Sequence, residues 1–200
     1  MKRISFILFL ISSVFPSLIL SQDWTGYYGG ITLSNHEGKT TYYQDGKLAA
    51  LTSNPDDRDG THSGLFGGYR HQNDKLVYAL DIERTNGKLG MSAVPENHLA
   101  TFSTVQLKIG YVVDNLLFTA GLGRFEAKIV PKCVSGCGAT FVRGDSISIG
   151  AEMMLEASFT VGFYVTKRKA NKNTVSGPSP WSWMNTTDDT AISLRLGYAF

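Results

Sequence analysis

The amino-acid sequence predicts an all-β fold: an eight-stranded antiparallel up-and-down transmembrane β-barrel. Three observations predict it. Segments in which every second residue is apolar recur eight times, which is the two-residue period of a strand with one apolar face. The connections between these segments alternate strictly between long and short, as in membrane barrels with an even number of strands. Aromatic residues of the apolar face gather beside the short connections, as expected of a belt at a membrane boundary.

The first 21 residues have the pattern of a secretory signal peptide. Two basic residues, Lys2 and Arg3, precede an uncharged, largely apolar run that ends at Ser21. We therefore predict a signal peptide over 1–21, cleaved after Ser21, and a barrel domain over 22–200; a retained membrane anchor is the alternative. Removing Lys2 and Arg3 lowers the basic residues from 19 to 17, equal to the 17 acidic ones, so nucleic acid is not an expected partner.

The first four predicted strands place large apolar residues on one face and small or polar residues on the other. A long polar connection, 35–61, follows the first strand, and a short turn at 72–75 separates the second from the third. A second long connection, 85–100, precedes the fourth strand. The four strands are predicted at 24–34, 63–71, 76–83 and 104–111.

The last four predicted strands continue the same alternation. The turn at Asp114 and Asn115 is short, the connection 126–144 is long, the turn at 156–158 is short, and the connection 167–187 is long. The strands are predicted at 118–123, 147–154, 159–165 and 190–200. The apolar face of the last strand consists of Ile192, Leu194, Leu196, Tyr198 and Phe200.

If the apolar face meets lipid, the polar face fills a lumen only wide enough for side chains. Six charged residues are then expected to pair there, because an unpaired buried charge costs several kcal/mol. They are Arg70, Asp81, Glu83, Lys108, Glu152 and Arg195. We favour a structural plug; a gate of re-pairing ions, or a narrow channel for small ligands, is the alternative. A soluble lipocalin-like binder would instead turn its apolar face inward around a ligand.

Three stretches carry the resemblance to a known family. They are the opening Asp23-Trp24-Thr25-Gly26-Tyr27-Tyr28-Gly29-Gly30, then Gly67-Gly68-Tyr69-Arg70 before a polar turn, and the terminal Leu196-Gly197-Tyr198-Ala199-Phe200. The chain resembles the small outer-membrane β-barrel family of Gram-negative bacteria that includes the membrane domain of OmpA, OmpX and the surface-antigen "porin family" proteins.

The resemblance implies an outer-membrane location, short periplasmic turns and long extracellular loops. It implies a structural and surface-interaction role, with the loops as the working surface for an extracellular ligand. It also implies that the barrel-assembly machinery recognises the end of the chain, with Leu194, Leu196, Tyr198 and Phe200 as the assembly signal. No cofactor and no periplasmic peptidoglycan-binding domain are expected.

Several loop residues invite a chemical interpretation. Cys133 and Cys137 are expected to form a local disulfide in an oxidising compartment; no histidine adjoins them, which argues against a metal site. The tripeptide Arg143-Gly144-Asp145 resembles an integrin-recognition sequence, but a bend entering the next strand is the preferred interpretation.

A basic loop segment is a possible contact for the phosphates of outer-membrane lipids and lipopolysaccharide. Its residues are Lys167, Arg168, Lys169 and Lys172. A lipid A-modifying enzyme would need a Ser–His arrangement near the outer rim, for which His62, Ser63 and His98 are available. Adjacent residues of a strand point to opposite faces, which argues against His62 acting with Ser63, so no enzyme is expected.

Overall fold

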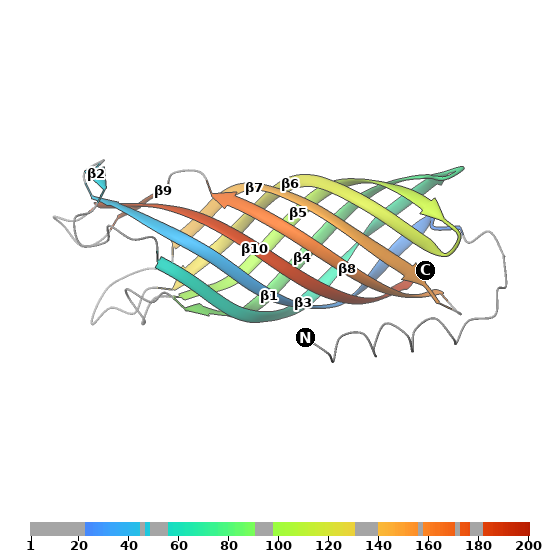
Figure 1. Ribbon diagram of the computed structural model, residues 1–200, viewed down its shortest axis with the longest axis horizontal. Helices are drawn as coiled ribbons and strands as arrows, with labels where there is room; N and C mark the ends of the chain where they lie inside the picture. The colour runs from blue at the N-terminus through green and yellow to red at the C-terminus, as the bar shows by residue number, and fades with distance from the viewer. Residues whose placement is uncertain are drawn as a thin grey trace, which may run out of the picture.

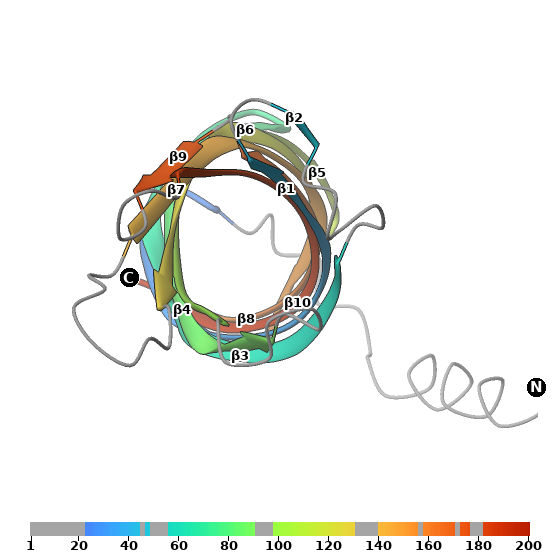
Figure 2. The same cartoon turned by 90° about the vertical axis from the view of Figure 1, so that its left-hand side faces the viewer.

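The computed structural model of the chain describes residues 23–44, 47–48, 56–90, 98–130, 140–155, 158–170, 173–176 and 182–200. Eight long strands form one closed antiparallel barrel (Figure 1 and Figure 2). They are β1 (Gly26–Gln44), β3 (Asp56–Asn73), β4 (Leu76–Gly90), β5 (His98–Val113), β6 (Leu116–Val130), β7 (Thr140–Met154), β8 (Phe159–Ala170) and β10 (Ser182–Ala199). The predicted eight-stranded up-and-down barrel is confirmed.

Each long strand pairs with the next long strand, and pairing between β1 and β10 closes the sheet. Leu33 lies opposite Leu194 in this seam, and the backbone N–H of Phe200 donates to the carbonyl of Tyr27 at 2.8 Å. Two short strands, β2 (Lys47–Leu48) and β9 (Asn173–Ser176), pair with β1 and β10 at the end that carries the long connections. Closure leaves the long strands without a free edge.

The short connections are tight turns that use residues tolerant of a left-handed backbone. Asp74 and Asp114 have positive φ angles of 56° and 54°, and each begins the two-residue turn between its strands. Asp and Asn adopt this conformation more readily than most residues because their short polar side chains bond the local backbone. Ser158, with φ of 69°, lies directly before β8. We call this end of the barrel the short-turn end.

The strands are much longer than predicted, and the long connections correspondingly shorter. The predicted connections 35–61, 85–100, 126–144 and 167–187 were therefore too long, because strand structure occupies 35–44, 56–61, 98–100 and 182–187 among other parts of them. A strand of 15 residues such as β4 spans about 50 Å at ~3.3 Å per residue. A strand needs only about 9–11 residues to cross a bilayer, so β4 is longer than a crossing requires. Beyond the apolar belt the outward residues become mostly polar, as at Arg84 and Ser103, so the apolar outward face that marks a strand ends while the backbone pairing continues.

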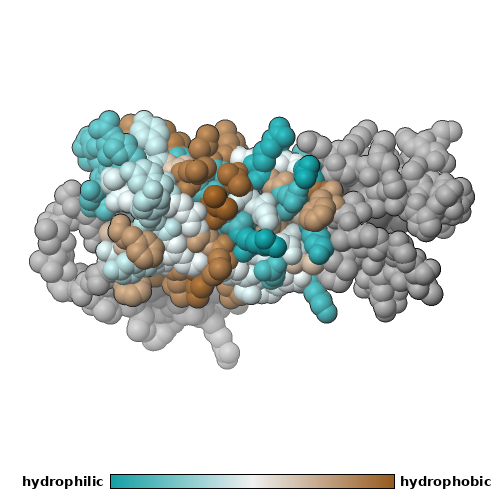
Figure 3. All heavy atoms as spheres, turned by 180° about the vertical axis from the view of Figure 1, so that it is seen from behind, coloured by the Kyte–Doolittle hydropathy of each residue, from teal (hydrophilic) through white to brown (hydrophobic). Residues whose placement is uncertain are grey.

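The apolar face points outward, as the barrel interpretation requires. Leu80 is 45 % exposed whereas its neighbour Asp81 is 2 % exposed. An apolar band crosses the outside of the barrel between hydrophilic residues towards both ends (Figure 3). The lipocalin-like alternative, which needs the apolar face inside, is therefore wrong.

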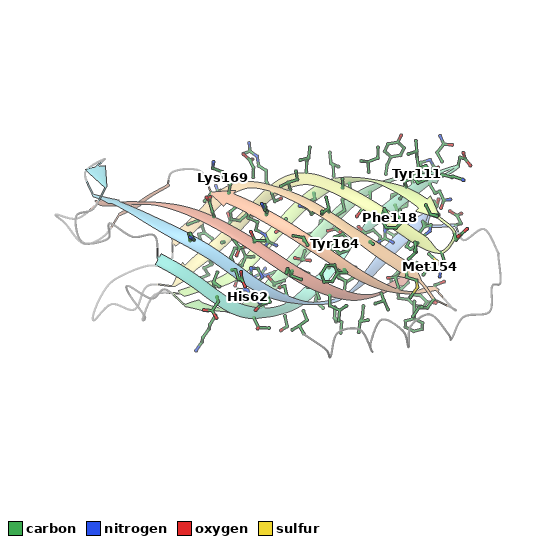
Figure 4. The ribbon with its side chains drawn as sticks, viewed as in Figure 1. His62, Tyr111, Phe118, Met154, Tyr164 and Lys169 are labelled. Atoms are coloured by element: carbon green, nitrogen blue, oxygen red, sulfur yellow. The ribbon has the colours of Figure 1, made fainter. Side chains whose placement is uncertain are left out.

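Outward aromatic side chains lie at the short-turn end, as predicted. Tyr111 and Phe118 project from the barrel there (Figure 4). Ring pairs at the same end join Tyr27 to Tyr69 with centroids 5.1 Å apart, and Tyr198 to Phe200 with centroids 5.2 Å apart.

Some predictions fall outside the described residues. These are the signal peptide over 1–21, the Cys133–Cys137 disulfide and the contact of Lys172. Within the described ranges, no helix is both long enough and apolar enough to cross a membrane.

Candidate functional site

The lumen holds the charged cluster that the alternation of the strands predicts. At its centre Arg195 of β10 binds two carboxylates of β4. Its Nη1 lies 3.0 Å from Asp81 Oδ2, and its Nη2 lies 2.5 Å from Glu83 Oε2. Lys108 Nζ lies 3.1 Å from Asp81 Oδ1, and the hydroxyl of Tyr28 donates to Asp81 Oδ2 at 2.8 Å. Asp81 is therefore contacted by two cationic side chains and one hydroxyl group, which reach it from three strands.

A second group continues the cluster towards the short-turn end. Arg70 Nη2 lies 2.5 Å from Glu152 Oε2, and the hydroxyl of Tyr164 donates to Glu152. The guanidinium of Arg70 also stacks 3.8 Å from the ring centre of Tyr28, which joins this group to Asp81. The Tyr164 ring accepts cation–π contacts from Lys108 at 4.2 Å and Arg195 at 4.4 Å. Figure 4 shows Tyr164 inside the barrel wall.

All six residues predicted for the lumen lie together in this cluster. The structure adds two that the sequence interpretation missed, Arg168 and Asp189, which pair at 2.9 Å. Arg168 also lies 3.5 Å from Glu83, so it extends the cluster towards the long-connection end. Among the described buried side chains, four strongly basic groups now balance four carboxylates.

The prediction that Arg168 contacts lipopolysaccharide is wrong. Its side chain is 1 % exposed and points into the lumen, because β8 continues to Ala170 and keeps its alternation. Its neighbours Lys167 and Lys169 are exposed on the outward face, and Figure 4 shows Lys169 directed away from the barrel.

The cluster ends in a buried Ser–His–Asp arrangement towards the long-connection end. The Nε2 of His36 lies 2.9 Å from Ser34 Oγ, and its Nδ1 lies 3.2 Å from both oxygens of Asp189. This connectivity matches a hydrolase triad. Ser34 is only 1 % exposed, however, and its hydroxyl also donates to the carbonyl of His62 at 3.4 Å. The arrangement therefore orients His36 within the packed lumen.

His62 lies beside this arrangement, with its ring 4.5 Å from that of His36 and 5.4 Å from that of Phe102. Both of its ring nitrogens are buried without a hydrogen-bond partner among the described residues. Ser63 is exposed on the opposite face of β3, so the two residues do not share a site, in agreement with the sequence argument.

Apolar side chains close the lumen on both sides of the charged cluster. Towards the short-turn end the buried group consists of Trp24, Val77, Val112, Leu117 and Met154. Towards the long-connection end it consists of Leu89, Phe102, Phe125, Ala127, Val142 and Ala170. We call these the lower and upper apolar caps. The sequence interpretation identified neither cap. The strands were recognised by apolar residues that alternate with small or polar ones, and an apolar residue on the inward face interrupts that alternation, so it looks like the end of the strand.

Inward glycines make room for these large groups within a narrow barrel. A Cβ at Gly150 would collide with the ring of Tyr164. A Cβ at Gly121 would lie 2.8 Å from Lys108 Cγ, and one at Gly162 would lie 2.8 Å from Glu152 Cγ. Tyr164, Lys108 and Glu152 therefore occupy the space that side chains at these glycine positions would need.

The tripeptide at 143–145 lies within β7 and not at a bend. Arg143 and Asp145 both face outward, where Arg143 Nε lies 2.7 Å from Glu126 and Arg124 Nε lies 3.5 Å from Asp145. The preferred interpretation of a bend is therefore wrong, and an adhesive loop is not formed at this position, because β7 pairs with strands on both sides.

Metal chemistry has no candidate centre in the described part of the chain. Within those residues, no three side chains of His, Cys, Asp or Glu are grouped so that they could hold an ion. The lumen is instead a set of mutually neutralising ion pairs between two apolar layers.

Comparison with solved structures identifies the fold. The outer membrane protein OprG from Pseudomonas aeruginosa is 17% identical, with a TM-score of 0.59 over 88% of this chain and 96% of its own. Neisserial surface protein A is 10% identical, with a TM-score of 0.46 over 86% and 99% of the two chains. No protein-family model and no curated protein matches the sequence. This chain therefore has the small closed β-barrel fold that OprG also has.

Proposed function

We propose that the protein is an outer-membrane β-barrel with a closed lumen, whose long-connection end is a surface for interactions outside the cell. One observation carries the proposal: large apolar side chains cover the outside of the wall while paired charges fill the inside. That inversion suits a hydrocarbon solvent, in which a closed barrel satisfies every backbone group. The similarity of the fold to OprG supports the same location.

Orientation follows from the lengths of the connections. Short turns on the periplasmic side and long loops outside are the rule for such barrels. The strands then project beyond the apolar band on the outer side, where most of their outward residues are polar. Export requires cleavage of the proposed signal peptide over 1–21, which N-terminal sequencing of the mature protein tests directly. Labelling with a lipid-soluble probe tests the faces: Leu80 and Ile109 should react and Asp81 and Lys108 should not.

The closed lumen distinguishes a structural protein from a channel. Paired charges and two apolar caps occupy the described lumen, and the interior of an eight-stranded barrel is only wide enough for side chains, which supports a lumen closed to hydrated ions. In planar bilayers the refolded protein should show no stable openings. Stable openings that vanish when Arg195 or Lys108 is neutralised would establish the alternative, a narrow channel gated by re-pairing ions.

The closing strand is proposed as the assembly signal for the barrel-assembly machinery. Leu194, Leu196 and Tyr198 alternate on the outward face of β10, and Phe200 follows at 79 % exposure. An aromatic end to an outward apolar row is available for recognition before the seam with β1 closes. We assign no enzymatic activity to the protein; lipid A from cells with and without it should have the same acyl chains.

A further inference from the structure

Two hollows on the outer wall of the barrel share a residue, Arg84 of β4. The first, which we call the polar pocket, has a volume of about 290 Å³ and is lined by Arg84, Thr101, Ser103, Glu126, Lys128 and Phe141. The second, which we call the apolar groove, has a volume of about 570 Å³, and Tyr27, Leu65, Gly67, Leu80, Ile82 and Arg84 line most of it. One molecule can therefore occupy both hollows only by passing Arg84.

The apolar groove exists because two outward positions lack side chains. Gly29 of β1 lies opposite Gly67 of β3, and Gly67 lies opposite Ile82 of β4. Larger residues flank this gap, including the Tyr27–Tyr69 ring pair at one end. The result is an apolar depression in a wall that otherwise presents projecting side chains. Its shape and chemistry suit a hydrocarbon chain that lies along the wall.

The polar pocket has the opposite chemistry and lies where the apolar band stops. Along the outward face of β4, Leu80 and Ile82 are followed by Arg84, the first charge. On β5, Ser103 lies opposite Arg84. It is the next outward residue beyond the apolar Val105 towards the long connections. In the proposed orientation this is the level of the headgroups of the outer leaflet.

The charges of the pocket favour an anion. Glu126 is already held by Arg143 at 2.7 Å, whereas Arg84 and Lys128 have no ion-pair partner among the described residues. Arg and Lys are the residues that bind phosphate with charge-assisted hydrogen bonds. The hydroxyl groups of Thr101 and Ser103 line the same pocket and can bond sugar hydroxyls.

From these observations we propose that the polar pocket and the apolar groove form one binding site for a phosphorylated, acylated sugar lipid of the outer leaflet. Arg84 and Lys128 bind its phosphate, and one acyl chain lies in the groove over Gly67. The inference rests on the proposed function, because it needs the barrel inserted with its long connections outside. It moves the expected lipopolysaccharide contact from the Lys167–Lys172 segment to β4, β5 and β6.

The test uses the full mature protein refolded in detergent and titrated with purified bis-phosphorylated lipid A, with native mass spectrometry as the readout. The Arg84→Ala/Lys128→Ala variant should weaken binding about tenfold or more, since it removes both charge-assisted contacts to the phosphate. Gly67→Leu, which fills the groove, should also weaken binding about tenfold, since the displaced acyl chain loses its apolar contacts with the wall. Dephosphorylated lipid A should bind the wild type as weakly as the double variant binds lipid A.

Matched controls give the outcomes their meaning. Lys167→Ala/Lys169→Ala removes two outward charges elsewhere on the rim. Ala120→Leu adds three carbons to the outward face of β6, one fewer than Gly67→Leu adds to β3. Both control variants should bind lipid A within twofold of the wild type. Equal losses in the controls, or no loss in Gly67→Leu, would overturn the proposal. Phosphatidylglycerol that displaces bound lipid A as well as free lipid A does would also overturn the proposal, in favour of a phospholipid site.

Failure of the inference and failure of the proposed function have different signatures. Heat-modifiable gel mobility and a β-sheet circular dichroism spectrum report whether each variant is a folded barrel. A folded wild-type barrel that does not bind lipid A refutes the lipid site alone. A wild type that stays in the soluble periplasm refutes the outer-membrane proposal itself.

Discussion

Removing the central carboxylate of the lumen should destabilise the barrel far more than removing an exposed one. Asp81→Asn keeps the size of the side chain but leaves Lys108, whose side chain is 3 % exposed, without a carboxylate at 3.1 Å. Arg195 retains Glu83, so the main loss is one orphaned buried ammonium. Breaking a buried pair from one side costs about 3–5 kcal/mol. Because the amide still accepts hydrogen bonds from Tyr28 and Arg195, we expect a loss near the lower limit, about 3 kcal/mol.

The assay is equilibrium urea unfolding in lipid vesicles, followed by tryptophan fluorescence and by heat-modifiable gel mobility. Asp145→Asn is the matched control, because its pair with Arg124 is 3.5 Å long and the two side chains are 66% and 81% exposed. Such exposed pairs contribute less than about 1 kcal/mol. The double variant Asp81→Asn/Lys108→Met removes the orphaned charge and should recover at least half of the lost stability.

Two results would refute this reasoning. One is an Asp81→Asn variant no less stable than Asp145→Asn, which would mean that the lumen is hydrated and screens its charges. The other is a double variant with a loss equal to the sum of the single losses, which would mean that Asp81 and Lys108 do not interact.

Phe102→Ala should lower the free energy of unfolding by about 3–5 kcal/mol in the same urea assay, because Phe102 is buried against His36, His62 and Phe125. The outward Phe163→Ala should lower it much less. Equal losses in the two variants would argue against a packed upper cap. Gly150→Ala should cost about 1–3 kcal/mol through its collision with Tyr164, whereas the outward Gly29→Ala, with its nearest contact at 3.4 Å, should be nearly neutral. A fluorophosphonate probe should leave folded protein unlabelled, since Ser34 is closed off; labelling that Ser34→Ala abolishes would reveal an accessible triad. Deleting Phe200 should reduce insertion in cells without slowing detergent refolding, and an equal defect in both would assign Phe200 to folding.

The eight strands and the outward apolar face were predictable because both depend on local alternation. In β10 the residues Ile192, Leu194 and Leu196 mark one face, and Arg195 must then lie on the other. The lumen positions of Asp81, Glu83, Lys108 and Glu152 follow from the same rule. No knowledge of the neighbouring strands is needed, since the pleat alone assigns each side chain to a face.

The ends of β8 and β10 escaped prediction because charged residues lie on both of their faces there. Arg168 and Asp189 continue the inward rows of β8 and β10, two residues at a time from Tyr164 and Arg195. Extending the period of two into the polar segments would have placed both in the lumen. The basic run at 167–169 instead reads as a solvated loop, since two of its three residues do face outward.

The ion-pair partner of each charged residue could not be predicted from the local sequence pattern. Asp81 and Arg195 lie 114 positions apart in the chain and come within 3.0 Å because β1 and β10 close the sheet and bring opposite walls of a narrow barrel together. The Ser34–His36–Asp189 arrangement and the shared position of Arg84 between two hollows arise in the same way. Alternation along a strand assigns a side chain to the inside or the outside, and the register between strands, together with closure, assigns its partners.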